Sequence, residues 1–215
     1  MVTAALDRWR NTTYTAYRWR YELSLLQKVA LALGMAGLTG LLAQARAYLP
    51  GTPVPITGQT LAVLLAGVML GKWWGGLSQA IYAGLGVAGL PWFAGWSGGI
   101  SHLAGPTGGY IIGFILAALF LGYFTDKYIR ARKFYSLLGL MFLADLVLIY
   151  TPGLLQLGLW LNVVKGQATG LYQVLAMGLF PFIAGDIIKV VLAAGLAWAI
   201  VPRKSFGHEA DRPLA

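Results

Sequence analysis

Two charged side chains stand three residues apart inside one of the most apolar stretches of the chain. Asp186 and Lys189 occur in PFIAGDIIKVV, residues 181–191. Residues i and i+3 are neighbours on a helix surface, so both side chains should project from one face. A charge within a membrane span costs at least about 2.5–3.5 kcal/mol and usually faces a bundle interior or a cavity. The pair therefore predicts a ligand-binding site. The alternative is a structural ion pair between helices, with Asp145 as a third member.

The surroundings of the pair refine this expectation. Pro181 and Gly185 favour a site over an ion pair, because they open the start of the helix and would let backbone groups approach a ligand. Asp145 is either a second functional carboxylate or a residue near a helix end that reaches for a Lys or Arg of the cytoplasmic loop. We favour the second interpretation.

A second candidate is the serine of Gly95-Trp96-Ser97-Gly98-Gly99, which fits the G-x-S-x-G pattern of serine hydrolases. That pattern needs a strand before it, a helix after it and a later histidine as base. The two histidines are His102, in the same loop, and His208, in the tail. Neither lies on a later membrane helix that could bring it to Ser97. An intramembrane serine hydrolase therefore ranks well behind a binding site, and we predict no catalytic residue.

Other chemistries lack their residues. The stretch GVMLGK, residues 67–72, resembles a phosphate loop, but it has three residues between its glycines and Trp73 where Ser or Thr is required. The chain is thus not expected to hydrolyse ATP by itself. It has no cysteine and two separated histidines, so we predict neither a metal site nor a cofactor.

Composition identifies the environment of these residues. The chain of 215 residues is 58% hydrophobic and 11% charged, with a mean hydropathy of +0.69, whereas soluble domains average about 25% charged residues. We predict an all-α membrane protein with six transmembrane helices. The expected spans are 29–49, 57–71, 75–91, 107–126, 135–160 and 171–201.

The net charge of +9 is spread in short patches between the apolar runs. This distribution is typical of membrane topology and argues against a nucleic-acid partner. With six spans and the N-terminus in the cytoplasm, thirteen basic residues lie on that side, and Arg46 and Lys165 lie outside. The cytoplasmic set comprises Arg8, Arg10, Arg18, Arg20, Lys28, Lys72, Lys127, Arg130, Arg132, Lys133, Arg203, Lys204 and Arg212. Both termini are therefore expected in the cytoplasm.

This topology divides the chain into three parts. Residues 1–28 are basic and aromatic and lack the pattern of a removable signal peptide. They should lie along membrane lipid, and the alternative is a solvated, partly disordered tail. Residues 29–201 form the six-helix substrate-binding domain, and residues 202–215 form a cytoplasmic tail. The external segments 50–56 and 92–106 are expected to cover a pocket that opens outward.

Two of the spans are short and rich in small residues. Residues 57–71 and 75–91 are joined by GKWWGG, residues 71–76, which leaves room only for a turn. Short, glycine-interrupted segments occur where they border a cavity. In the first span, Ala32, Ala36 and Gly40 form a stripe that would let another helix approach closely. That helix belongs either to a partner or to the chain itself.

Four sequence blocks resemble the BioY family, the biotin-specific substrate-binding (S) components of energy-coupling factor (ECF) transporters. The blocks are PVPITGQTLAVLLAG (53–67), GLPWFAGWSGG (89–99), GPTGGYIIGFILAA (105–118) and PFIAGDIIK (181–189). Their order and spacing are similar to those of the family from about residue 29 to residue 200. The resemblance implies the ECF S-component fold, with biotin bound on the external side.

The resemblance also implies roles for particular residues. Asp186 and Lys189 match the binding-site Asp and Lys of the family's last helix, and Ser97 matches a loop position where relatives can carry Asn. The sequence has no Arg near GPTGGY to bind the biotin carboxylate, so that partner is open and His102 is a candidate. Trp92, Trp96 and Tyr82 are expected to form an aromatic wall, and Gln59 to add a polar contact.

In the family, transport requires a transmembrane coupling subunit (T component) and two ATPase subunits. The resemblance therefore favours Ala32, Ala36 and Gly40 as the partner interface, in the cytoplasmic membrane of a prokaryote. Three alternatives stay open: an S component for another vitamin, the serine hydrolase that uses Ser97, and a proton-coupled carrier that uses Asp186.

Overall fold

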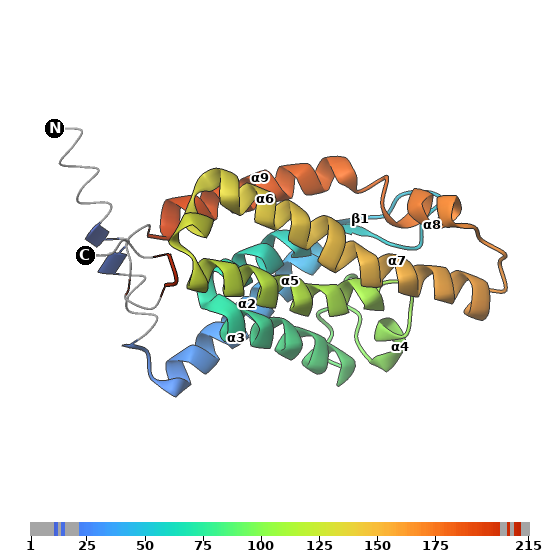
Figure 1. The fold of residues 1–215 in the computed structure, drawn as a ribbon. Coiled ribbons are helices and arrows are strands. Elements are labelled where there is room, and N and C mark those ends of the chain that lie inside the picture. Colours follow the sequence, from blue (N-terminus) through green and yellow to red (C-terminus); the bar gives the residue numbers. More distant parts are fainter. Residues whose placement is uncertain (1–10, 13, 16–21, 203–205, 207–208, 212–215) are drawn as a thin grey trace.

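The computed structural model describes residues 11–12, 14–15, 22–202, 206 and 209–211. Most of the charged and aromatic residues of the predicted surface segment 1–28, and His208 in the tail, lie outside the described residues. The fold is a bundle of helices with one two-stranded sheet (Figure 1). The long helical elements are α2 (Leu25–Gln44), α3 (Gln59–Val87), α5 (Gly108–Lys127), a run made of α6 (Phe134–Leu143), η2 (Ala144–Ile149), α7 (Tyr150–Leu159) and η3 (Trp160–Val164), and α9 (Ile183–Ile200).

Short elements connect these helices. They are the antiparallel strands β1 (Arg46–Ala47) and β2 (Ile56–Thr57), α4 (Ile100–Leu103), η1 (Ile129–Arg132) and α8 (Leu171–Gly178). Within the described residues, five helices or helical runs are long and apolar enough to cross a membrane, and the longest is Phe134–Val164. The predicted helical membrane class is confirmed.

The element α3 is two helices folded against each other rather than one. Gly71 has φ 79° and ψ −179°, outside the helical region. The amide of Gln59 donates a hydrogen bond of 2.7 Å to the hydroxyl of Tyr82, 23 residues away, whereas a straight helix would separate them by roughly 35 Å. Gln59–Leu70 and Lys72–Val87 are therefore antiparallel arms, which divides the five candidate spans into six helices. The predicted pair of short helices is confirmed, but the turn is at Gly71 and residues 72–76 are already helical.

Glycines let this hairpin pack closely on α5. A Cβ at Gly67 would lie 2.5 Å from the carbonyl oxygen of Ala118, and one at Gly122 would lie 2.3 Å from the backbone nitrogen of Lys72. No side chain fits at such distances, so the two backbones touch as small residues allow in membrane bundles. The same Lys72 N–H donates to the Asp126 carboxylate at 2.9 Å. The turn is thereby fixed to the end of α5.

The small-residue stripe of α2 faces inward. Ala32 and Ala36 are fully buried within the chain, and the site of a Cβ at Gly40 lies 3.0 Å from Trp92. The expectation that this stripe forms a partner interface is therefore wrong for this structure, and packing inside the bundle is observed. The spacing could not distinguish the two, because any close helix favours the same small residues.

The last predicted span, 171–201, is interrupted. It contains α8, a break at residues 179–182 and then α9. Pro181 has no N–H to continue a helix, and Asp186 consequently lies in the first turn of α9, where a negative charge is favoured by the helix dipole. The start of α2 and the end of α9 lie at the same end of the bundle (Figure 1), so the described part of the chain crosses an even number of times.

Candidate functional site

A cavity that is partly continuous with solvent lies between the α3 hairpin, α5, η2, α7 and α9. Its lining consists of Val54, Pro55, Thr57, Gln59, Thr60, Tyr82, Ala94, His102, Thr107, Tyr110, Ile111, Phe114, Asp145, Ile149, Tyr150, Phe182, Asp186 and Lys189. Both predicted cover segments, 50–56 and 92–106, contribute to it.

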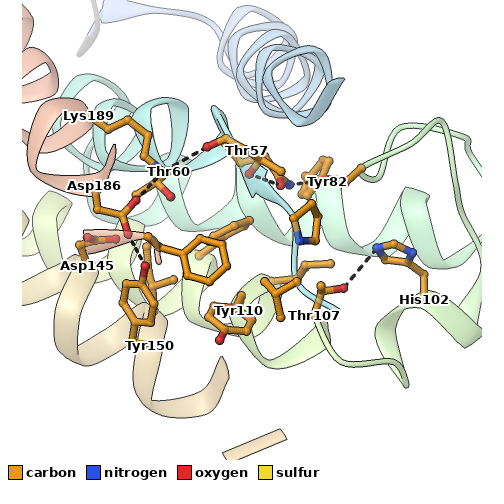
Figure 2. A pocket seen from close by; sticks show the side chains of 18 residues that line it. Thr57, Thr60, Tyr82, His102, Thr107, Tyr110, Asp145, Tyr150, Asp186 and Lys189 are labelled. Atoms are coloured by element: carbon orange, nitrogen blue, oxygen red, sulfur yellow. Dashed lines mark hydrogen bonds and ion pairs between the residues drawn. The ribbon is translucent and has the colours of Figure 1, made fainter. Parts of the chain in front are cut away.

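Asp186 and Lys189 lie together at the polar end of the cavity (Figure 2). Lys189 Nζ forms an ion pair with Asp186 Oδ1 and donates to the backbone oxygen of Thr57 at 3.1 Å. The Tyr150 hydroxyl donates to Asp186 Oδ2. Asp186 is 3% exposed. The predicted pair is thus an ion pair and also lines a cavity, so both interpretations of it describe part of the geometry.

Asp145 is the main departure from expectation near this pair. It lies within η2 and not at a helix end, is 1% exposed and lines the cavity. Neither of its oxygens has a hydrogen-bond partner among the described residues. The predicted contact with a loop Lys or Arg is therefore wrong. The wide π-helical turn of η2 precedes Pro152, which cannot donate the N–H that would close a regular helix, and such turns are frequent at functional sites.

Gln59 and Tyr82 line the cavity as expected, one from each arm of the hairpin. Their mutual hydrogen bond is extended by Thr57, whose hydroxyl donates to Gln59 Oε1 at 2.8 Å. Trp92 is not part of the lining. Its indole N–H donates to the backbone oxygen of Tyr82 at 2.9 Å, and the two rings lie 5.3 Å apart. Trp92 therefore supports the cavity wall from behind.

Trp96 and Ser97 also lie outside the lining residues. Gln44 of α2 holds their loop, since its amide donates to the Phe93 oxygen at 3.0 Å and its oxygen accepts the Trp96 N–H at 3.0 Å. Trp96 has φ 54° and is 66% exposed. The expected aromatic wall from Trp96 is thus not observed, because the strained loop turns this ring outward.

The structure brings Ser97 to a histidine, contrary to expectation. Ser97 Oγ donates to the Ala94 oxygen at 2.9 Å and lies 3.1 Å from His102 Nδ1. The other ring nitrogen, Nε2, lies 3.3 Å from the Thr107 hydroxyl. Burial lowers the pKa of His102 below its ordinary value, so its imidazole is neutral at physiological pH. Residues 97–102 form a turn that brings the two side chains together. The sequence spacing did not indicate this turn.

A second hollow adjoins the cavity beside His102. It shares Pro55, Ala94, His102 and Thr107 with the cavity and extends to Tyr48. His102 and Thr107 lie at the opposite end of the cavity from Asp186 and Lys189 (Figure 2). The elements β1 and α4 lie at the end of the bundle away from the start of α2 (Figure 1). The hollow therefore forms a mouth at that end.

Several lining residues were not predicted. Tyr110 and Tyr150 line the cavity with their rings 5.8 Å apart, and the Tyr110 hydroxyl donates to the Gly178 oxygen at 2.8 Å. An aromatic residue in an apolar span gives no pattern that separates lipid-facing from cavity-facing positions. Asp145 did carry a signal, because an ionisable residue within a span is by default a candidate for function. Within the described residues, no cluster of three His, Cys, Asp or Glu side chains could hold a metal ion.

Comparison with known proteins decides the family. The sequence matches the BioY family over residues 12–205. The chain belongs to the BioY family. A "probable biotin transporter BioY" of Methanothermobacter thermautotrophicus is 56% identical over 147 residues, which cover 68% of this chain and 94% of that protein.

A second curated relative and a solved structure are also similar to the chain. The biotin transporter BioY of Thermotoga maritima is 38% identical over 149 residues, covering 69% of this chain and 82% of that one. A solved structure, the S-component for biotin from an ECF-type ABC transporter, superposes with a TM-score of 0.72 at 24% identity, over 82% of this chain and 93% of its own. The predicted S-component fold is confirmed by this likeness.

Proposed function

We propose that this BioY-family protein binds biotin in the cavity and acts as the substrate-binding component of an ECF-type transporter. The observation that carries the proposal is the position of Asp186 and Lys189 at the polar end of a cavity that also has an apolar, aromatic lining. It is supported by the family membership and by relatives named as biotin transporters.

The chemistry of this end suits a cyclic urea. The ureido ring of biotin has two N–H donors and one carbonyl acceptor. A carboxylate accepts N–H groups and an ammonium donates to a carbonyl, and both bonds are charge-assisted and therefore strong. Tyr110, Phe114 and Phe182 give the cavity apolar surface for the thioether ring and the alkyl chain. Gln59 offers a further polar contact.

The other end of the cavity suits the biotin carboxylate. The neutral His102 ring and the Thr107 hydroxyl line both the cavity and its mouth. The Thr107 hydroxyl can donate a hydrogen bond, and so can the His102 ring in the tautomer that carries its proton on Nε2, although neither carries the positive charge of an Arg. The carboxylate would then lie at the mouth, partly in water, while the ureido ring is buried beside Asp186.

Binding of labelled biotin to the purified protein in detergent tests the proposal. The wild type should bind saturably. Asp186→Asn should weaken affinity about 10- to 150-fold, which corresponds to the roughly 1.5–3 kcal/mol of a hydrogen bond to a charged group. Asp186→Asn alone leaves the Lys189 ammonium without its ion-pair partner, which could impair folding. The double variant Asp186→Asn/Lys189→Met removes both charges and avoids this problem. Asp211→Asn, the same change outside the cavity, should leave affinity unchanged.

The absence of saturable binding would remove the proposal. A panel of other vitamins in competition with labelled biotin separates it from the alternative of another substrate on the same scaffold. Displacement by another heterocycle at lower concentration than biotin would reassign the ligand.

Transport is proposed to need a coupling subunit, two ATPase subunits and the cytoplasmic membrane of a prokaryote. The chain lacks a phosphate loop, and its basic residues near the start of α2 suit a cytoplasmic face. Lys72 and Lys127 lie at that end. Their Nζ atoms are 5.4 and 5.1 Å from the centre of the Tyr123 ring. Biotin uptake into cells should therefore rise when the coupling and ATPase subunits are co-expressed. Equal uptake without them, abolished by an uncoupler, would favour the proton-coupled carrier.

The contact between Ser97 and His102 makes a serine hydrolase the second candidate. Its geometry is less suitable than that of a triad, because Ser97 donates its proton to the Ala94 oxygen and the far ring nitrogen of His102 meets a hydroxyl rather than a carboxylate. We expect no labelling by a fluorophosphonate and little change in biotin affinity for Ser97→Ala. Labelling that Ser97→Ala abolishes, together with ester turnover, would favour the hydrolase.

A further inference from the structure

Asp145 carries a feature that the Asp186–Lys189 pair does not explain. Within the part of the chain that the structure describes, its two oxygens are the only buried side-chain polar atoms without a hydrogen-bond partner. The residue is 1% exposed and lines the cavity. Burying a polar group without a partner costs free energy. A carboxylate kept in this state beside an open cavity therefore has unused hydrogen-bonding capacity where a ligand would lie.

The neighbouring charges leave Asp145 uncompensated. Lys189 forms its ion pair with Asp186, which also accepts from Tyr150. Asp145 interacts with Asp186 and Lys189 only through their charges, at a distance without a hydrogen bond. Figure 2 shows Asp145 next to Asp186, on the side away from Lys189. Two carboxylates thus face one ammonium, and the Asp145 oxygens remain able to accept hydrogen bonds from a molecule in the cavity.

We propose that Asp145 is a second ligand-contacting carboxylate, which accepts a hydrogen bond from a ring N–H of the bound molecule while Asp186 accepts one from another. The site would then be specific for ligands that present two donors, as a cyclic urea does. This inference rests on the proposed function. It gives the two ureido N–H groups separate acceptors.

The first test separates a ligand contact from a structural role. Asp145→Leu removes an unpaired buried carboxylate with a side chain of similar size, and Asp145→Asn keeps the shape. Without biotin, both variants should unfold at the temperature of the wild type or above it. Their affinity for biotin should fall about 10- to 150-fold. Asp211→Asn, the same change outside the cavity, is the control for affinity, which it should leave unchanged. A lower unfolding temperature with unchanged affinity would overturn the inference.

The second test uses the ligand. Biotin methylated on one or the other ureido nitrogen removes one donor at a time, and both isomers should bind the wild type more weakly than biotin does. In Asp145→Leu, the isomer blocked at the nitrogen that faces Asp145 should lose little further affinity, since its partner is already absent. This coupling is a double-mutant cycle between protein and ligand.

The outcomes distinguish the inference from the proposed function. If the wild type binds biotin and both methylation penalties persist unchanged in Asp145→Leu, Asp145 does not contact the ring and the biotin proposal stands. If one penalty disappears, Asp145 is the acceptor of that N–H. If the wild type does not bind biotin saturably, the proposed function itself fails.

Discussion

This BioY-family protein buries charged side chains in two regions that differ in how completely they are paired. Near the end of α9, Arg132 is fully buried and bonded throughout: its guanidinium donates to Glu209 at 2.8 Å, to the Thr125 oxygen at 2.8 Å and to the Pro202 oxygen at 3.5 Å. Glu209 also accepts the Phe206 N–H. At the cavity, by contrast, the Asp145 carboxylate has no hydrogen-bond partner among the described residues.

The difference separates a structural charge from one available to a ligand. The Arg132 cluster joins the loop after α5 to the described residues of the tail, and Asp211 strengthens this junction by accepting the N–H groups of Ile129 and Arg130 at 2.6 and 3.0 Å. The cavity cluster keeps hydrogen-bonding capacity beside open volume. Burial of a charged side chain therefore does not by itself identify a binding residue. Burial together with unused hydrogen-bonding capacity beside a cavity does.

The largest effect is expected from breaking the fully paired cluster. Arg132→Met leaves the Glu209 carboxylate buried without its cation, which should cost about 3–5 kcal/mol of the free energy of unfolding. Thermal unfolding in detergent measures the loss. Arg130→Met is the matched control, because the Arg130 side chain is 73% exposed in its ion pair with Asp211 and should cost at most about 1 kcal/mol. Equal effects of the two changes would show that burial does not distinguish these ion pairs.

The next effect concerns ligand affinity. Lys189→Met removes the donor proposed for the ureido carbonyl and leaves Asp186 with only Tyr150. Biotin affinity should fall about 10- to 150-fold, measured by binding of labelled biotin. Lys165→Met, a change at an exposed position, serves as the control. An affinity equal to that of the wild type would assign the ion pair a purely structural role.

A smaller effect is expected from Tyr150→Phe. The change removes only the hydroxyl that donates to Asp186, so the carboxylate keeps its ion pair with Lys189 and remains able to accept from a ligand. Affinity should change by about two- to tenfold, in keeping with the roughly 0.5–1.5 kcal/mol of a single hydrogen bond. A loss as large as that of Lys189→Met would mean that Tyr150 positions the whole cluster.

The smallest effect concerns pH at the mouth of the cavity. The folded chain holds the pKa of His102 below the value of about 6.5 expected for the unfolded chain. The unfolded chain therefore binds more protons as the pH falls through about 6.5, and this contribution to stability is present above that pH and is lost below it. Unfolding temperatures measured between about pH 7.5 and pH 5.5 should decline less for His102→Gln than for the wild type. Unfolding temperatures that decline equally with pH in both proteins would contradict the lowered pKa of His102.

Sequence patterns were sufficient for the charged pair and for the helices. Asp186 and Lys189 stood out because charges are rare in apolar spans, and the short spans around Gly71 were visible as glycine-interrupted segments. Patterns were insufficient where the answer depends on which neighbour a residue meets. Ala32 and Ala36 carry the same spacing whether the close helix is a partner or the chain's own hairpin.

Loops were the hardest part to predict. Trp96 turns outward and Ser97 meets His102 because Gln44 accepts the Trp96 N–H and donates to the Phe93 oxygen, and because Trp96 has a positive φ. No local sequence pattern indicates these features. Asp145 was misjudged for another reason. Its π-helical surroundings and the absence of a partner depend on three-dimensional packing, although its charge within a span was already a signal.

The turn at Gly71 constrains how the growing chain enters a bilayer. The arms on either side of it are roughly 18 and 24 Å long at about 1.5 Å per residue, and the apolar layer is about 30 Å thick. Neither arm alone reaches the thickness of this layer, so we expect the two to enter the bilayer together as one hairpin. The faces of the hairpin that pack on α5 have no partner until Gly122 and its neighbours have been synthesised. The cavity wall that the hairpin forms is therefore supported only after α5 has been synthesised.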